Sequence, residues 1–326
     1  MSEIVGVVGM SHSPFATLLD PPAPGAPGAG FLADAERVRA AVADLAPDAV
    51  VVVGPDHFHG NFYDVMPPFV LGVEEVVGFG DFGSRAGPLP VATELAWAVR
   101  DGLTADGVDV AISYSLTVDH GIVQGYEMLL GGTGVPLVPL VLNTAAPPLP
   151  TPQRCLVVGR ALGAALRTAP TGRVLVVASG GLSHWLPSND PRDPAVVGER
   201  RASLIHGRQD PVAFAAAREP RVRAMAGNPD SPVNAGWDRW FLERLASDDP
   251  EAVAALGHEG IEAAAGSGGQ EIRTWLLAHA AVGRPTVWSS YEPVPEWITG
   301  MGIATSFPVA DEPARDRDAV AAGGAG

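Results

Sequence analysis

The chain has 326 residues, of which 21 are basic and 37 acidic, so its formal net charge is −16, and 47% of its residues are hydrophobic. This acidic, globular composition argues against a general nucleic-acid-binding protein, because affinity for the phosphate backbone comes from clustered Lys and Arg. All basic residues are Arg and the sequence contains no Lys, which excludes Schiff-base lysine chemistry, P-loop nucleotide hydrolases and protein kinases.

Short apolar, β-branched segments predict six strands, over residues 4–8, 49–53, 69–73, 108–114, 137–142 and 174–178. Segments that are apolar on both faces are typical of strands covered by helices on both sides of a sheet. Helical periodicity lies between them, over residues 32–45, 91–103 and 153–166. The alternation predicts an α/β fold with a central, mostly parallel or mixed sheet sandwiched by helices.

After Ser183 the pattern changes to consecutive helices, over residues 194–205, 211–218, 234–246, 251–256 and 269–282. We expect them to form a helical layer from the C-terminal half on the same domain, because no linker separates them from the strands. The sequence therefore predicts one α/β domain over residues 1–308 and a flexible C-terminal tail over residues 309–326, where apolar periodicity is lost.

Cys155 is the only cysteine and lies within an apolar helical pattern, so it is interpreted as a core residue. A single cysteine excludes intrachain disulfides and cysteine-ligated zinc or iron–sulfur sites. The apolar stretch from Ile4 to Met10 is too short for a signal peptide or a membrane span. We expect a cytoplasmic location.

Four histidines follow predicted strands directly: His12, His57, His120 and His184. In open α/β sheets ligands bind at the carboxyl ends of the strands. We therefore expect these four side chains to gather at one functional site.

The sequence around His57 contains a second histidine, His59, and both side chains would share a face if the extended conformation continued. Both could then reach a metal ion. The alternative, which the sequence favours for His59, is a surface residue.

A metal site also needs a carboxylate, and Glu271 is the best placed. Ser267 and Gln270 have the spacing of a capping box, which would start a helix near Gly268 and put Glu271 in its first turns. On spacing alone, Glu271 could merely complement the helix dipole.

His12, His57 and Glu271 would together make a two-histidine, one-carboxylate face, which is typical of non-haem Fe(II) oxygenases. Zinc hydrolases use the same ligand atoms, often in an H-E-x-x-H motif, which is absent here. His120 and His184 would then remain as unligated acid/base groups.

Nine phrases in order resemble one family: SHSP (residues 11–14), PDHF (55–58), NFYDVMPPF (61–69), FGDFGS (79–84), VDHG (118–121), SGGLSH (179–184), NAGWD (234–238), EIRTW (271–275) and PEWITGMG (295–302). Together they resemble the class III extradiol ring-cleavage dioxygenases over nearly the whole chain. The resemblance is weakest in parts of the stretch between Trp185 and Asp230, which could shape the pocket for the ring substituent.

The resemblance implies a homo-oligomeric enzyme that uses Fe(II), with His12, His57 and Glu271 as ligands and His120 and His184 as the catalytic pair. It implies cleavage of a 3-substituted catechol with O2 to a 2-hydroxy-6-oxodienoate, and 3-(2,3-dihydroxyphenyl)propionate is the candidate substrate. Neither nucleic acid nor a membrane is expected as a partner.

Three questions stay open at this point. Asp119, adjacent to His120, is a candidate to orient the site residues by hydrogen bonding without contacting the metal. An equal alternative is a solvated turn residue. A zinc hydrolase on the same metal face and a non-enzymatic binding protein of the same fold are the competing functions. A substrate carboxylate would favour an Arg partner, and the sequence does not choose among the four near the motifs: Arg173, Arg201, Arg239 and Arg273.

Overall fold

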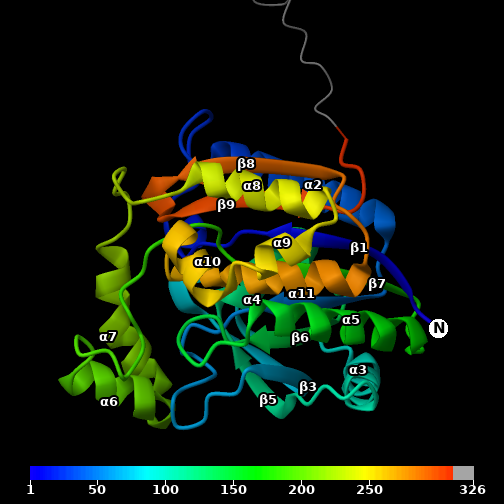
Figure 1. The fold of residues 1–326 in the computed structure, drawn as a ribbon, viewed down its shortest axis with the longest axis horizontal. Helices are drawn as coiled ribbons and strands as arrows, with labels where there is room; N and C mark the ends of the chain where they lie inside the picture. Colours follow the sequence, from blue (N-terminus) through cyan, green and yellow to red (C-terminus); the bar gives the residue numbers. More distant parts are fainter. Residues whose placement is uncertain (311–326) are drawn as a thin grey trace, which may run out of the picture.

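The computed structural model describes residues 1–310, and these contain nine strands in one sheet (Figure 1). The strands are β1 (Glu3–Met10), β2 (Ala49–Gly54), β3 (Phe69–Phe79), β4 (Ala86–Leu89), β5 (Ala111–Val118), β6 (Leu137–Leu142), β7 (Arg173–Ser179), β8 (Trp288–Val294) and β9 (Thr299–Thr305). Their order is β4-β3-β6-β2-β7-β1-β9-β8, and β5 pairs with β3.

The same residues contain eleven α-helices: α1 (Phe15–Leu18), α2 (Ala29–Leu45), α3 (Thr93–Ala105), α4 (His120–Leu130), α5 (Pro152–Thr168), α6 (Gly198–His206), α7 (Pro211–Arg223), α8 (Ala235–Ala246), α9 (Pro250–Ala254), α10 (Gly257–Ala265) and α11 (Ile272–Val282). A short 3₁₀ turn, Gly268–Glu271, leads directly into α11.

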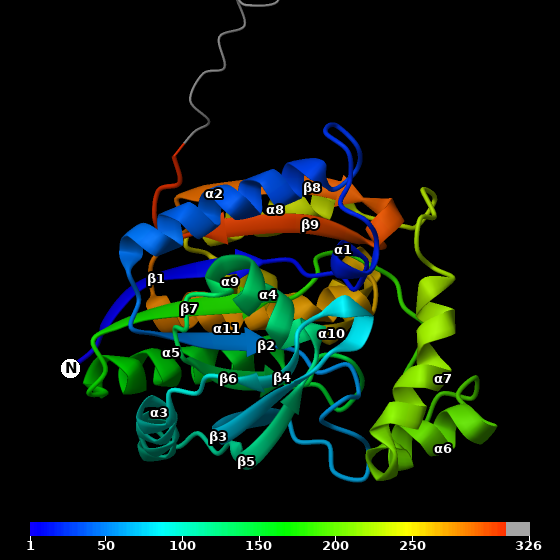
Figure 2. The ribbon, with the colours of Figure 1, turned by 180° about the vertical axis from the view of Figure 1, so that it is seen from behind.

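The centre of the sheet is parallel and is covered on both faces. Strands β6, β2, β7 and β1 pair in parallel, whereas β3 and β9 join them in antiparallel fashion. Helices α3, α5 and α11 cover one face, and α2 and α4 cover the other (Figures 1 and 2). Every residue of β2 is buried, as expected for a strand with helices on both sides. The predicted α/β sandwich with a mixed sheet is confirmed.

The C-terminal half is not purely helical, and here the prediction was incomplete. After α11 the chain returns to the sheet as the antiparallel pair β8 and β9, and β9 pairs with β1. Most of β8 is partly exposed, so its sequence lacks the continuous apolar pattern of a central strand. Helix α4 was also not predicted. It begins at His120 itself, inside the VDHG phrase.

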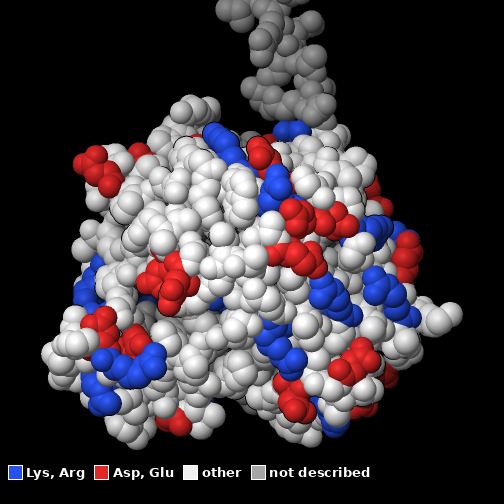
Figure 3. Space-filling view, in the orientation of Figure 1, with Lys and Arg blue, Asp and Glu red and all other residues white. Residues whose placement is uncertain are grey.

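Helices α6 and α7 form a lobe beyond the end of the sheet, at the lower left of Figure 1. A separate hydrophobic cluster of Phe58, Phe62, Ala146, Val196, Leu204 and Phe214 packs this lobe against the loop after β2. The lobe therefore lies next to the segment that carries His57. On the face shown in Figure 3, acidic and basic side chains are interspersed.

Cys155 is buried in α5, which confirms its interpretation as a core residue. Within residues 1–310, no helix combines the length and the apolar character that crossing a bilayer requires. The tail predicted from residue 309 falls largely on residues 311–326, outside the described part of the chain. The domain division at residue 308 stays a prediction.

Helices α5 and α11 approach closely because glycines line their contact. A Cβ atom on Gly163 would lie 2.1 Å from the carbonyl oxygen of Ala281, and one on Gly159 would lie 2.2 Å from that of Leu277. Neither backbone oxygen can rotate away as a flexible side chain could. This pair of glycines therefore allows the close spacing of α5 and α11.

We expect Gly163→Ala to lower the free energy of unfolding by about 1–3 kcal/mol, the usual cost of overpacking a core. Gly236→Ala is the matched control, because its Cβ would meet nothing closer than 3.6 Å within α8 and Ala favours helix. Urea unfolding of both variants measures the difference. Equal stability of the two variants would contradict the close-packing argument.

Candidate metal centre

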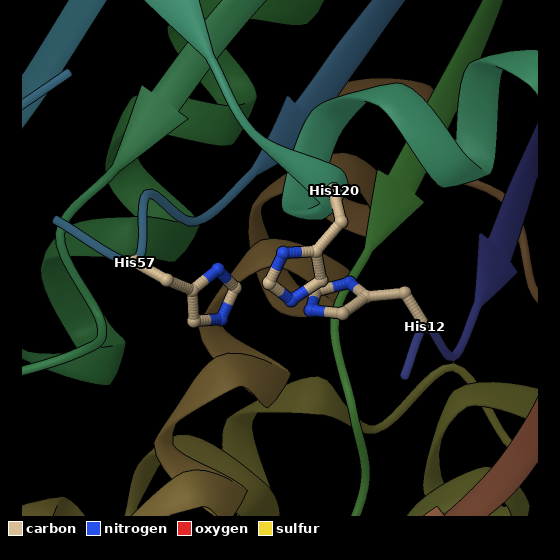
Figure 4. Close-up of side chains that lie close together, drawn as sticks. All are labelled: His12, His57 and His120. Atoms are coloured by element: carbon tan, nitrogen blue, oxygen red, sulfur yellow. The ribbon is translucent and has the colours of Figure 1, made fainter. Parts of the chain in front are cut away.

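Three of the four predicted histidines follow neighbouring parallel strands. The strand order β2-β7-β1 places the segments that carry His57, His184 and His12 together at the carboxyl ends of these strands. His120 arrives differently, as the first residue of α4, which packs against β2 and β7. The structure thus brings all four together, and Figure 4 shows His12, His57 and His120 facing one another.

Glu271 completes this group from the start of α11, which packs against β1 and β7. Its Oε2 lies 3.3 Å from Nε2 of His12, and its Oε1 lies 3.2 Å from Nε2 of His57. The backbone N–H of Gly181 donates to Oε2 at 2.6 Å. Two imidazole nitrogens and one carboxylate therefore converge on one buried point.

The capping box predicted ahead of α11 is wrong, although a helix does start there. Ser267 makes no capping bond; its hydroxyl accepts from the backbone N–H of Leu186 and donates to the carbonyl of the same residue, both at 3.0 Å. The hydroxyl therefore joins two loops instead of capping a helix.

The protonation states of His12 and Glu271 suit a metal cation. Burial has the largest influence on His12 and lowers its pKa to about 3, aided by the charges of His120 and His57 and opposed by Glu271. Burial alone would raise the pKa of Glu271, but His12 and His57 outweigh it and hold that pKa well below its usual range. The site thus presents a neutral imidazole beside an ionised carboxylate.

His57 behaves differently because two carboxylates flank it. Burial lowers its pKa, but Asp119 and Glu271 outweigh burial and raise the pKa to about 10. A proton between His57 and Glu271 therefore occupies a position where a bound cation could replace it. Two imidazole nitrogens with one carboxylate fit Fe(II) and related divalent metals.

Each of the four histidine rings is held through its Nδ1 atom, by a partner outside the centre. Nδ1 of His12 lies 3.0 Å from the hydroxyl oxygen of Ser179, and Nδ1 of His184 donates to the carbonyl oxygen of Leu182 at 2.8 Å. Because a carbonyl only accepts, Nε2 of His184 carries a free lone pair in the neutral ring. This Nε2 lies 3.8 Å from Oε1 of Glu271.

His120 is held by an aspartate that the sequence did not single out. Nδ1 of His120 contacts Oδ2 of Asp81 closely, and the backbone N–H of His120 donates to Oδ1 of Asp81 at 3.0 Å. The ring of His120 stacks on that of His57 with centroids 4.3 Å apart. The only sequence signal for Asp81 is its place in the FGDFGS phrase.

Asp119 is fully buried, so its interpretation as a solvated turn residue is wrong. One of its oxygens accepts from the backbone N–H of His57 at 2.5 Å, and the other lies 3.3 Å from Nδ1 of the same ring. It also caps α4 by accepting from Gly121 N–H at 2.8 Å. Asp119 therefore orients His57, whereas Asp81 contacts the neighbouring His120.

His59 is buried, which overturns its interpretation as a surface residue. Its Nδ1 lies 3.0 Å from Oδ2 of Asp119. His59, Asp81 and Asp119 have ligand atoms close enough together to hold a metal, and so do His12, His57 and His120, whose atoms lie within 4.8 Å of one another. Distance alone therefore does not rank the donor sets.

The five converging residues, His12, His57, His120, His184 and Glu271, line a small cavity with apolar walls, which we call the metal chamber. Its apolar lining comes from Phe82, Leu186, Val222, Met225 and Ile298. His57 and Glu271 also line an adjoining outer cavity of about 480 Å³. This volume lies within the roughly 300–1,000 Å³ of typical small-molecule sites.

Known proteins resemble the chain along most of its length. Residues 6–302 match the family described as the catalytic LigB subunit of aromatic ring-opening dioxygenase. A 2,3-dihydroxyphenylpropionate/2,3-dihydroxicinnamic acid 1,2-dioxygenase of Rhodococcus sp is 40% identical over 318 residues, 94% of this chain and 99% of the relative. The enzyme of the same name from Klebsiella pneumoniae subsp. pneumoniae is 39% identical, over 90% of this chain and 95% of its own.

A solved structure shares the fold. The crystal structure of an uncharacterized protein from Escherichia coli K12 matches 92% of this chain and 98% of its own with a TM-score of 0.56, at 14% sequence identity.

The family match confirms the resemblance seen in the sequence and identifies a dioxygenase in place of a hydrolase or a non-enzymatic binding protein. The chain belongs to the LigB family of extradiol, aromatic ring-opening dioxygenases.

Proposed function

We propose that this protein opens the ring of 3-(2,3-dihydroxyphenyl)propionate with O2, and that His12, His57 and Glu271 hold Fe(II) for this reaction. The convergence of two imidazole nitrogens and an ionised carboxylate beside a cavity of ligand size carries the proposal. The substrate is the one for which relatives that are about 40% identical over 90% or more of this chain are named.

His12, His57 and Glu271 would hold Fe(II), which would supply the Lewis-acid and redox chemistry that a reaction of a diol with O2 needs. The protein supplies the donor set and keeps it dry, since all three donors are buried. His12 and Glu271 need no proton removed before they bind a cation, because one is neutral and the other ionised.

His184 is the proposed general base. Its Nε2 lone pair faces the metal chamber because Nδ1 is occupied by the carbonyl of Leu182. It can accept a phenolic proton from the catechol, which makes the ring more electron-rich and more reactive toward O2.

His120 is the proposed general acid. Asp81 contacts its Nδ1 and so orients the ring, which leaves Nε2 directed to the metal chamber as the proton donor. A proton donated to a leaving oxygen atom of the substrate lowers the barrier to ring opening.

The homo-oligomeric state and the cytoplasmic location expected from the sequence stay predictions.

Each ligand should be essential for metal binding, since its removal leaves only two protein donors. We expect His12→Ala, His57→Ala and Glu271→Ala to lose bound iron and activity while remaining folded, as judged by iron analysis and circular dichroism. His206→Ala removes an exposed histidine and is the control. Retention of stoichiometric iron by His57→Ala, together with its loss in His59→Ala, would show that the wrong histidine was chosen.

The proton-transfer pair should behave differently from the ligands. His120→Ala and His184→Ala should retain iron but lose about 10²- to 10⁴-fold in kcat, the range usual for general acid/base groups. Iron content and steady-state rates measured on the same preparations test this. Loss of iron in His120→Ala would instead support the set of three histidines as ligands.

The cleavage position tests the reaction class and distinguishes it from a zinc hydrolase. With 3-(2,3-dihydroxyphenyl)propionate we expect a yellow 2-hydroxy-6-oxo-nona-2,4-diene-1,9-dioate, with one O2 consumed per ring and no added reductant. An oxygen electrode and the product's absorbance and mass give the answer. A muconate product, or a requirement for NADH, would contradict the assignment.

A further inference from the structure

Arg218 places a positive charge at the junction of the cavities around the candidate site. It lies in α7, and its Nη1 donates closely to the backbone carbonyl of His57. Arg218 and Leu186 both line the metal chamber, the outer cavity, and a third cavity of about 150 Å³ beneath the α6–α7 lobe. A molecule that fills the metal chamber would therefore lie against the Arg218 side chain.

No acidic group within residues 1–310 forms an ion pair with Arg218. The charges of Asp119, Asp81 and Asp56 raise its pKa, but their oxygens are engaged elsewhere. Asp119 contacts His57 and the other two are bound by His120 and by backbone N–H groups of the loop after β2. The guanidinium has one backbone acceptor and no partner of opposite charge.

A partly buried cation of this kind, with no ion-pair partner among residues 1–310, favours a carboxylate. Burial lowers the pKa of Arg218 and the three aspartates oppose that effect, yet an arginine remains protonated in proteins. Its planar fork matches a carboxylate with two parallel, charge-assisted hydrogen bonds, which are stronger than neutral ones. The bond to His57 uses only one of its three nitrogens.

Among residues 1–310, Arg218 is the arginine that lines the metal chamber. Arg192 lines the outer cavity, but Asp190 binds it through two nitrogens. The four arginines near the sequence motifs do not line the metal chamber: Arg173 pairs with Glu3, Arg201 donates to Pro191, Arg239 stacks on Tyr291, and Arg273 is buried against Pro150 and Gln270.

We propose that Arg218 binds the carboxylate of the ring substituent and so selects acidic over neutral catechols. This inference rests on the proposed function, because it presumes that the diol of the same molecule binds in the metal chamber. The apolar walls of that chamber would contact the ring and its methylene groups, and Arg218 would meet the charge at their end. Arg218 is a residue of specificity and takes no part in the proton transfers.

A pair of substrates with the same shape separates charge recognition from fit. Wild-type enzyme is assayed on 3-(2,3-dihydroxyphenyl)propionate and on the corresponding propanamide, in which a neutral amide replaces the carboxylate. Arg218→Gln should lower kcat/KM for the acid about 10- to 100-fold, mainly through KM, and leave the amide nearly unchanged. Arg218→Lys keeps the charge without the fork and should give an intermediate loss.

Arg223→Gln is the matched control, since it removes the same charge from an exposed position at the end of the same helix, outside the three cavities, and should alter the use of neither substrate. Equal losses for acid and amide in Arg218→Gln, or loss of iron, would show that Arg218 only positions His57. Equal use of the two compounds by wild type would overturn the inference without any variant. Cleavage of neither compound would instead contradict the proposed function.

Discussion

The contact of the Glu271 carboxylate with two imidazole rings inside the protein constrains how the strands and the helix that carry these residues pack together. An ionised carboxylate is costly to bury unless charges or hydrogen bonds surround it. Here His12, His57 and the N–H of Gly181 provide them. These groups follow β1, β2 and β7, so the register of three parallel strands and the start of α11 must agree for the contact to form.

Close packing enforces that agreement. A Cβ atom on Gly180 would lie 2.9 Å from the carbonyl oxygen of Glu271, and one on Gly268 would lie 2.0 Å from Nε2 of His184. The glycines on both sides of the centre therefore allow two backbones to approach until the side chains meet. Behind the rings, Asp81 and Asp119 hold Nδ1 of His120 and His57, so the nitrogens that face the metal chamber are defined by contacts outside it.

Much of the fold was accessible from the sequence, because central parallel strands are apolar on both faces and leave a clear pattern. The pair β8 and β9 lies toward an edge, where polar and glycine residues interrupt that pattern. The four histidines could be grouped because each follows a strand. Arg218 and Asp81 could not be assigned, because their roles depend on tertiary contacts with His57 and His120 that no local spacing encodes.

The α6–α7 lobe has a hydrophobic cluster of its own, in addition to the two cores that hold the sheet, and its Val222 also packs against one of those cores. Chemistry and selectivity thus have different structural foundations in this chain. The sheet and the helices packed on it supply the donors and proton carriers, whereas the lobe contributes Arg218 and Val222 to the walls. Such a division favours evolvability: substitutions within the lobe can retune which aromatic acids are accepted at little cost to the stability of the catalytic framework.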